Sequence, residues 1–181
     1  ETSTLSRDSL KYGYENVDSK EFADIYVFNT CSVTENANKE TRKLIRRSKR
    51  INPNAFITLV GCYAQLKPEE LTNIEDVNLV LGTEDKIELL NHLDRIDFSN
   101  DIKSSYGGPI TDVKTFKPSY SSDDRTRSFL KVQDGCDYNC TFCTIPLARG
   151  RSRNASIKKT VNLAKDISRT NAKEIVLTGV N

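Results

Sequence analysis

Apolar residues in the first hundred positions gather into short runs, each followed by a stretch with helical character. Three runs have the length of buried strands, at 23–29, 55–60 and 77–82. The stretches that follow them predict helices over 35–51, from 67 onward and over 86–93. A short helix over 3–12, ended by Gly13, precedes the first strand. This alternation predicts an α/β fold, with a small parallel, doubly wound sheet covered on both faces.

The pattern restarts after a long polar stretch. Residues 99–124 contain Gly108-Pro109 and Pro118 but few apolar side chains, which predicts an interdomain linker. Beyond it, a strand at 128–133, a helix at 156–170 and a strand at 174–178 form one βαβ unit. A closed (β/α)8 barrel needs about 250 residues, so this unit is long enough only to open one. We therefore expect an N-terminal domain over 1–98, a linker over 99–124 and the start of a second domain over 125–181.

Composition adds a constraint on location and on partners. Hydrophobic residues make up 36% of the chain, and no run of eighteen apolar residues is present to span a membrane. The net charge of +2 conceals a basic segment, because residues 39–50 carry seven basic side chains and one acid, Glu40. Such a helix could bind nucleic-acid phosphates or could be an ordinary solvated face, and base rates favour the second interpretation. The chain shows no secretory signal, so we expect a cytoplasmic protein.

Three cysteines lie within eight residues, directly after the predicted strand at 128–133. Cys136, Cys140 and Cys143 follow a C-x3-C-x2-C pattern. An iron–sulfur cube normally takes four Cys ligands, so a loop that offers three leaves one iron with an open position for a reaction partner.

Zinc and disulfide bonding are the alternatives for these cysteines. A disulfide needs pairs, and three clustered cysteines leave one over. A structural zinc site needs four nitrogen or sulfur ligands, yet the only histidine, His92, lies far upstream and is interpreted as a surface residue. The spacing favours iron–sulfur over zinc and places a disulfide last.

The two remaining cysteines, Cys31 and Cys62, each follow a predicted strand directly. Ligands of parallel sheets bind at the carboxyl edge of the strands, where both cysteines would lie. A second metal site is the favoured interpretation, and two ordinary buried cysteines are the alternative.

The C-x3-C-x2-C motif, with Phe142 before its last cysteine, resembles that of the radical S-adenosylmethionine enzymes. The whole chain resembles the tRNA methylthiotransferase family, and most of all the branch that acts on N6-threonylcarbamoyladenosine beside the anticodon. The segments that carry this resemblance are Asn29-Thr-Cys-Ser-Val-Thr, Val60-Gly-Cys-Tyr-Ala-Gln and Lys131–Arg153, which includes Asp-Gly-Cys-Asp and Ala-Arg-Gly-Arg-Ser-Arg.

The resemblance implies a role for each motif. Cys136, Cys140 and Cys143 would hold a four-iron four-sulfur cluster, and Phe142 would place its backbone near the adenine of S-adenosylmethionine. Cys31 and Cys62 would hold a second, auxiliary 4Fe-4S cluster that supplies sulfur. Possible substrate contacts follow the loop at Arg149, Arg151 and Arg153. The implied reaction adds a methylthio group at C2 of the adenosine in tRNA, with an electron donor such as flavodoxin or ferredoxin.

The family has further parts that are not in these 181 residues. Its auxiliary cluster takes a third cysteine, which we expect before residue 1, and its barrel and C-terminal RNA-binding domain would continue after residue 181. We therefore expect the chain to be inactive by itself. The competing hypotheses are a metal-stabilised RNA-binding module without radical chemistry, and a radical methylthiotransferase acting on another tRNA adenosine or on a ribosomal protein.

Overall fold

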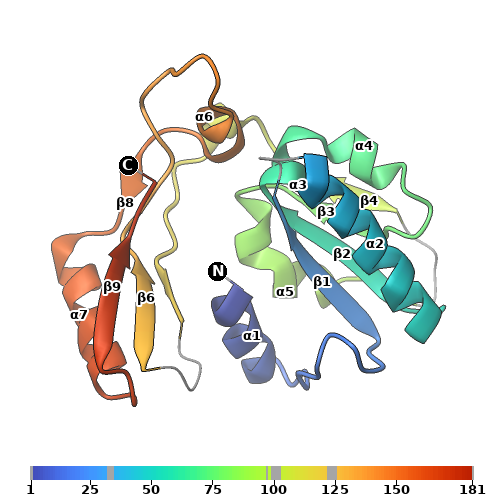
Figure 1. Ribbon diagram of the computed structural model, residues 1–181, viewed down its shortest axis with the longest axis horizontal. Helices are drawn as coiled ribbons and strands as arrows, with labels where there is room; N and C mark the ends of the chain where they lie inside the picture. The colour runs from blue at the N-terminus through green and yellow to red at the C-terminus, as the bar shows by residue number, and fades with distance from the viewer. Residues whose placement is uncertain (1, 32–34, 97, 99–102, 122–125, 181) are drawn as a thin grey trace. The chain divides into compact units, whose positions relative to one another are not determined.

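A computed structural model describes residues 2–31, 35–96, 98, 103–121 and 126–180, and Figure 1 shows its elements. The chain forms two compact units, one spanning Asn16–Val113 and one that joins the residues up to Glu15 with those from Lys114 onward. These limits differ from the boundaries expected at 98 and 125. The reason lies in helix α1 (Thr2–Lys11), because the guanidinium of Arg7 lies 4.2 Å from the ring centroid of Tyr120 and donates to its carbonyl at 3.0 Å.

The first unit is built on a four-stranded sheet in the order β1-β2-β3-β4, and all neighbouring pairs are parallel. Its strands are β1 (Ile25–Thr30), β2 (Phe56–Gly61), β3 (Leu79–Leu81) and β4 (Ser104–Tyr106). The first three confirm the predicted strands. The fourth falls inside the predicted linker, where backbone hydrogen bonds place it: Ser104 donates to the Asn78 carbonyl and Gly82 to that of Tyr106, both at 2.8 Å. A polar Ser-Ser-Tyr strand gives no hydrophobic signal.

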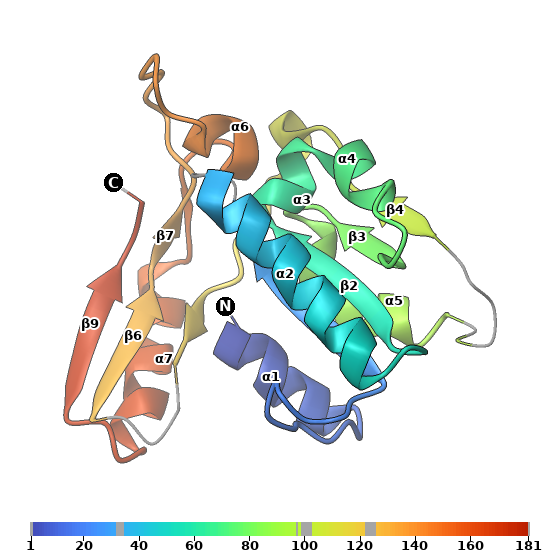
Figure 2. The same ribbon diagram turned by 45° about the vertical axis from the view of Figure 1, so that its right-hand side comes forward.

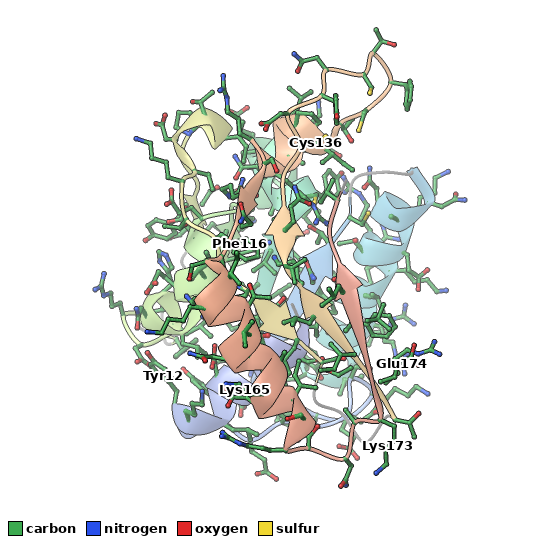
Figure 3. The ribbon with its side chains drawn as sticks, turned by 90° about the vertical axis from the view of Figure 1, so that its left-hand side faces the viewer. Tyr12, Phe116, Cys136, Lys165, Lys173 and Glu174 are labelled. Carbon is green, nitrogen blue, oxygen red and sulfur yellow. The ribbon has the colours of Figure 1, made fainter. Side chains whose placement is uncertain are left out.

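Helices cover both faces of this sheet. They are α2 (Glu35–Ile51), α3 (Cys62–Leu66), α4 (Pro68–Thr72) and α5 (Leu89–Leu93), with the 3-10 helices η1 (Asp85–Glu88) and η2 (Ile110–Asp112). Figures 1 and 3 show α2 and α5 on opposite sides of the sheet. Ile45 of α2 packs in one core with Ile57, Leu59 and Val80, and alternate strand residues such as Leu79 and Leu81 are also fully buried. The expected cover on both faces is therefore present, and it explains why every residue of β2 is buried. The predicted doubly wound topology is wrong, because the strand order β1-β2-β3-β4 of the described residues has no reversal.

Two details of this unit bear on the expectations. The sequence Ser32-Val-Thr-Glu35 has the spacing of a helix-opening capping box, but residues 32–34 lie outside the described residues, so this box stays a prediction. His92, interpreted as a surface residue, is in fact half-buried: its ring lies 4.6 Å from the Tyr106 ring, and its Nε2 lies 3.7 Å from Asp85 Oδ1. The short strand β4 supplies this cover, which is why the sequence did not show it.

The second unit contains a three-stranded sheet in the order β5-β6-β9. Strands β6 (Arg127–Lys131) and β9 (Glu174–Thr178) are parallel and are joined through helix α7 (Ile157–Ser168), which confirms the predicted βαβ unit. Ser156 caps α7 by accepting a hydrogen bond from the Lys159 amide. Strand β5 (Ser119–Tyr120) adds antiparallel to β6. The continuation of this unit into a barrel stays a prediction.

Between β6 and α7 the chain forms a further small element set. A two-stranded antiparallel sheet pairs β7 (Gln133–Asp134) with β8 (Arg153–Asn154), and helix α6 (Ile145–Arg149) lies between them in sequence. Figure 2 shows β7 leading from β6 into the loop that ends at α6. From the sequence alone, residues 146–153 indicate only a basic turn, with arginines at 149, 151 and 153. Within the described part of the chain, no helix is long and apolar enough to cross a membrane.

Candidate metal centre

The β7–β8 pair closes the base of the loop that carries three of the five cysteines. Gln133 pairs with Asn154 and Asp134 with Arg153, so residues 135–152 form one closed excursion from the sheet. Figure 3 shows Cys136 where this excursion leaves its base. We call residues 135–152 the cysteine loop. Its two ends are held together by backbone pairing, so the loop can present several donor atoms without help from distant segments.

The carboxylate of Asp134 is the charged centre of the loop base, and only 5% of its side chain is exposed. Three cations surround it: Lys131 Nζ at 3.2 Å, Arg149 Nη1 at 3.2 Å and Arg153 Nη2 at 3.9 Å. Its Oδ1 also accepts the Gly135 amide hydrogen bond at 2.9 Å. A buried carboxylate is tolerated because these partners replace the water it has lost. Asp134 thereby ties β6, β7, α6 and β8 together beneath the cysteines.

Gln133 and Gly135 complete the loop base. The Gln133 amide Nε2 donates to the Gly135 carbonyl at 2.7 Å and to Ser152 Oγ at 2.9 Å, while its Oε1 accepts the Val180 amide at 2.6 Å. Gly135 has a φ of +74°, and a Cβ there would collide with the Arg151 carbonyl. Only glycine fits this close approach of the two loop ends.

Cys136, Cys140 and Cys143 are not joined in a disulfide. The Cys136 amide donates to the Gly150 carbonyl at 3.0 Å, which fixes the first cysteine beside the far end of the loop. The Cys143 amide donates to the Cys140 carbonyl at 3.1 Å, which folds the other two into one turn. Cys140 is exposed, and Cys136 and Cys143 are half-buried.

These thiols fit a soft metal group by their chemistry, but they do not form a preassembled cage. Among the described residues, no three His, Cys, Asp or Glu side chains converge as a metal-binding group. Three thiolates on one short, solvent-reachable loop are nevertheless the donor set that iron–sulfur clusters take. The fixed part of the site is therefore the loop base, and the side chains at its tip are the part that a bound group would gather.

The tip of the loop also carries exposed apolar side chains. Phe142 is 88% exposed, Tyr138 66% and Leu147 62%. Phe142, predicted to lie near an adenine, is thus accessible to a ligand. Large exposed apolar side chains on one loop are typical of an interaction surface.

The three arginines predicted as substrate contacts have different surroundings. Arg153 is an internal residue, with 9% of its side chain exposed. Its guanidinium donates to the carbonyls of Thr115 at 3.0 Å, of Arg151 at 2.9 Å and of Arg149. Arg149 contacts Asp134, and Arg151 is exposed. Of the three, Arg151 is therefore the one whose side chain is presented to solvent, while Arg153 and Arg149 hold the loop base.

Cys31 and Cys62 lie at one edge of the other sheet, as the strand pattern predicted. Each directly follows one of two register partners, Thr30 of β1 and Gly61 of β2. Thr30 Oγ1 donates to the Val60 carbonyl at 2.7 Å, which ties the two strand ends together. Gly61 has a φ of +105°, and a Cβ there would collide with the Thr30 carbonyl and lie 2.6 Å from Asn29 Oδ1. Cys31 is exposed and Cys62 is half-buried, so both are reachable at the carboxyl edge.

A charged cluster supports the helix that begins with Cys62. The hydroxyl of Tyr63 donates to Glu70 Oε1 at 2.6 Å, and Arg42 of α2 donates to the same oxygen at 3.1 Å. The Tyr63 hydrogen bond lowers the pKa of Glu70 from its ordinary value of 4.5, Arg42 adds to this effect, and burial opposes it in part. Burial and the neighbouring Glu70 carboxylate raise the pKa of Tyr63.

This cluster predicts a measurable pH dependence. Because folding favours the Glu70 carboxylate, its stabilising effect is present above pH 4.5 and is lost as pH falls through the lowered pKa. Replacing Tyr63 by Phe is expected to lower stability by about 1 kcal/mol at pH 7 and by less below pH 4. Thermal unfolding measured at both pH values checks this result. Tyr26→Phe is the control, because its hydroxyl donates to the Glu21 carbonyl and should give a loss of equal size at both pH values.

Comparison with known proteins supports the resemblance described above. Residues 1–82 match the model of a family described as "Uncharacterized protein family UPF0004". The chain is 39% identical over 181 residues to threonylcarbamoyladenosine tRNA methylthiotransferase MtaB of Aquifex aeolicus (strain VF5), covering 99% of this chain and 44% of that protein. It is 38% identical over 188 residues to the protein of the same name from Bacillus subtilis (strain 168), covering 100% of this chain and 40% of the relative.

A more distant relative has another substrate in its name. The chain is 31% identical over 169 residues to ribosomal protein uS12 methylthiotransferase RimO of Trichodesmium erythraeum (strain IMS101), covering 93% of this chain and 38% of that protein. Residues 1–82 thus match the UPF0004 family model, and the chain is similar to methylthiotransferases along nearly its whole length, which confirms the predicted resemblance. It spans about two fifths of the length of these relatives.

Sequence reasoning did not assign the residues that build the loop base. Asp134, Gln133 and Gly135 lie inside the motif that was recognised, but none received a role. One signal was available: Asp134 is an acid set between Lys131 and the arginines at 149, 151 and 153. An acidic residue that adjoins a metal-binding motif in such a basic segment could have been read as the structural partner of those cations.

Proposed function

We propose that this chain is part of a radical S-adenosylmethionine enzyme that adds a methylthio group to tRNA. The observation that carries the proposal is the cysteine loop, whose three free thiols stand on a base fixed by Asp134 and Gly135. The relatives named as methylthiotransferases support the same reaction class. A polar, internally paired base that carries a loop with three cysteine thiols is the arrangement expected of a metal-site scaffold.

The proposed cofactors follow from the donor set. Cys136, Cys140 and Cys143 would hold a 4Fe-4S cluster that, with S-adenosylmethionine, supplies radical cleavage of the sulfonium. Cys31 and Cys62 would hold an auxiliary cluster, with a third ligand from outside these residues. The chain's own part would be to hold the first cluster on the cysteine loop, whose base is fixed by Asp134 and Gly135. The same loop offers the exposed side chain of Phe142. An electron donor such as flavodoxin or ferredoxin would complete the reaction.

The proposed substrate is N6-threonylcarbamoyladenosine of tRNA, modified at C2. Its support is the name and the 38–39% identity of the two relatives from Aquifex aeolicus and Bacillus subtilis, against 31% for the relative named for a ribosomal protein. Arg151, the exposed arginine at the end of the loop, is the side chain of this set best placed to meet an anionic substrate.

Mass analysis of tRNA nucleosides tests this function. A strain that lacks the gene is expected to accumulate N6-threonylcarbamoyladenosine without the methylthio group, and the full-length gene should restore the modified nucleoside. Ribosomal protein S12 should keep its mass in both strains. Loss of a modification from S12 or from another tRNA adenosine would overturn the substrate. Stoichiometric zinc in the anaerobically purified protein, with no S-adenosylmethionine cleavage, would overturn the radical chemistry.

A further inference from the structure

A row of exposed cations on α2 has no role in the proposed chemistry. It consists of Lys39, Lys43, Arg46, Arg47 and Arg50, all exposed. At about 100° per residue these positions fall within roughly a quarter to a third of the helix circumference. We call these five residues the α2 cation row. The opposite face of the helix holds the buried residues Thr41, Ile45 and Ser48. The cations are therefore concentrated on the side that faces away from the sheet.

Internal pairing accounts for the cations beside the row, but it does not account for Arg46, Arg47 and Arg50 within it. Arg42 is tied to Glu70 at 3.1 Å, and Lys49 donates to the Pro53 carbonyl at 3.1 Å. In the row, Lys43 meets Glu40 at 3.6 Å in an exposed pair. Within the described ranges, no carboxylate lies at ion-pair distance from Arg46, Arg47 or Arg50. Cations at a helix C-terminus complement its dipole, but Arg46 and Arg47 lie before the last turn, where that effect has faded.

The composition of the helix identifies the chemistry of a partner. Residues 41–51 contain six cations and no carboxylate, so like charges repel along this part of the helix. The row spans about 16 Å, the axial length of on the order of five phosphates of one duplex strand. No aromatic residue occurs in Glu35–Ile51, so the helix offers neither a stacking platform nor a base wedge. Such a surface is suited to bind the regularly spaced phosphates of a nucleic-acid backbone, and it offers no groups that recognise bases.

We propose that the α2 cation row binds the phosphate backbone of the substrate tRNA, at a stem and not at the modified base. This inference rests on the proposed function for the identity of the RNA. Neutralising phosphates supplies affinity without sequence information. The first unit would thus hold a stem of the RNA by charge, while the cysteine loop would hold the cluster that takes part in the reaction.

Binding of an unmodified tRNA transcript to the full-length protein tests the proposal. The triple variant Arg46→Ala, Arg47→Ala and Arg50→Ala should keep its fold, because alanine favours helix and the buried face is unchanged. We expect at least tenfold weaker binding at 0.1 M salt, and a slope of log affinity against log salt that is smaller by about 3. The matched control is the triple alanine variant of Lys158, Lys159 and Lys165, three exposed cations of α7, which removes the same charge and should leave the slope near that of the wild type.

The outcomes separate this inference from the proposed function. An equal loss in both triple variants would show a general charge effect and would overturn the cation row. Unchanged tRNA binding in the α2 variant would also overturn the proposal for the cation row. Binding of polyglutamate is measured in the same way, and if the α2 variant loses only this binding, the row would be assigned to an acidic protein instead. Cleavage of S-adenosylmethionine is measured in parallel without RNA. If cleavage is absent while the α2 variant still loses tRNA affinity, the enzyme proposal fails and the RNA-binding face stands.

Discussion

Replacing Asp134 by alanine is expected to lower the free energy of unfolding of the second unit, which contains the cysteine loop, by about 3 kcal/mol. The change leaves the cations of Lys131, Arg149 and Arg153 facing one another without the carboxylate that joins them. It also removes the acceptor of the Gly135 amide. Because the loop base carries Cys136 directly, the variant should also hold much less iron after anaerobic reconstitution. Chemical denaturation and iron analysis of the full-length protein measure the two effects.

A second acid provides the control for Asp134. Asp166 forms an exposed ion pair with Arg169 at 3.1 Å on α7, so Asp166→Ala should change stability by less than about 1 kcal/mol and leave iron content unchanged. Asp134→Asn separates charge from shape, since its amide oxygen can still accept from Gly135. Wild-type stability and iron content in both Asp134 variants would show that the cation cluster does not organise the loop.

Replacing Cys140 by alanine is expected to abolish reductive cleavage of S-adenosylmethionine, because two thiolates would remain on the cysteine loop. Cys140 is exposed and its side chain is not part of the core, so the variant should fold as the wild type does. The measurements are 5′-deoxyadenosine formation on reduction and the visible absorbance of the reconstituted protein. Thr141→Ala, the exposed neighbour, is the control and should retain both signals. Continued 5′-deoxyadenosine production by Cys140→Ala would contradict the ligand assignment.

The parts of the fold that the sequence revealed are those with a hydrophobic period. Strands β1, β2 and β3 are apolar runs, and this pattern alone predicts that Cys31 and Cys62 lie at one sheet edge. The βαβ unit of β6, α7 and β9 was found in the same way. In each case burial against a helix dictates the residue types, so the pattern carries the structure.

The parts that were missed are held by polar contacts between distant residues. Arg7 and Tyr120 are 113 positions apart, and their contact places α1 with the C-terminal unit. The two-residue strands β7 and β8 are too short to show alternation. Asp134 gathers cations from positions 131, 149 and 153, which no local pattern links. Backbone pairing and buried charge have no period, so these features emerge only when the chain is folded.

Gly61 has a consequence for the spacing of Cys31 and Cys62. The carbonyl of Thr30 lies where a Cβ of residue 61 would be, so the two strand ends approach as closely as bare backbone allows. Cys31 and Cys62 directly follow these strand ends. Their separation therefore depends on the missing Cβ of Gly61 and not on either cysteine. One added methyl group would widen the gap between two potential ligands while leaving both of them, and every strand residue around them, chemically intact.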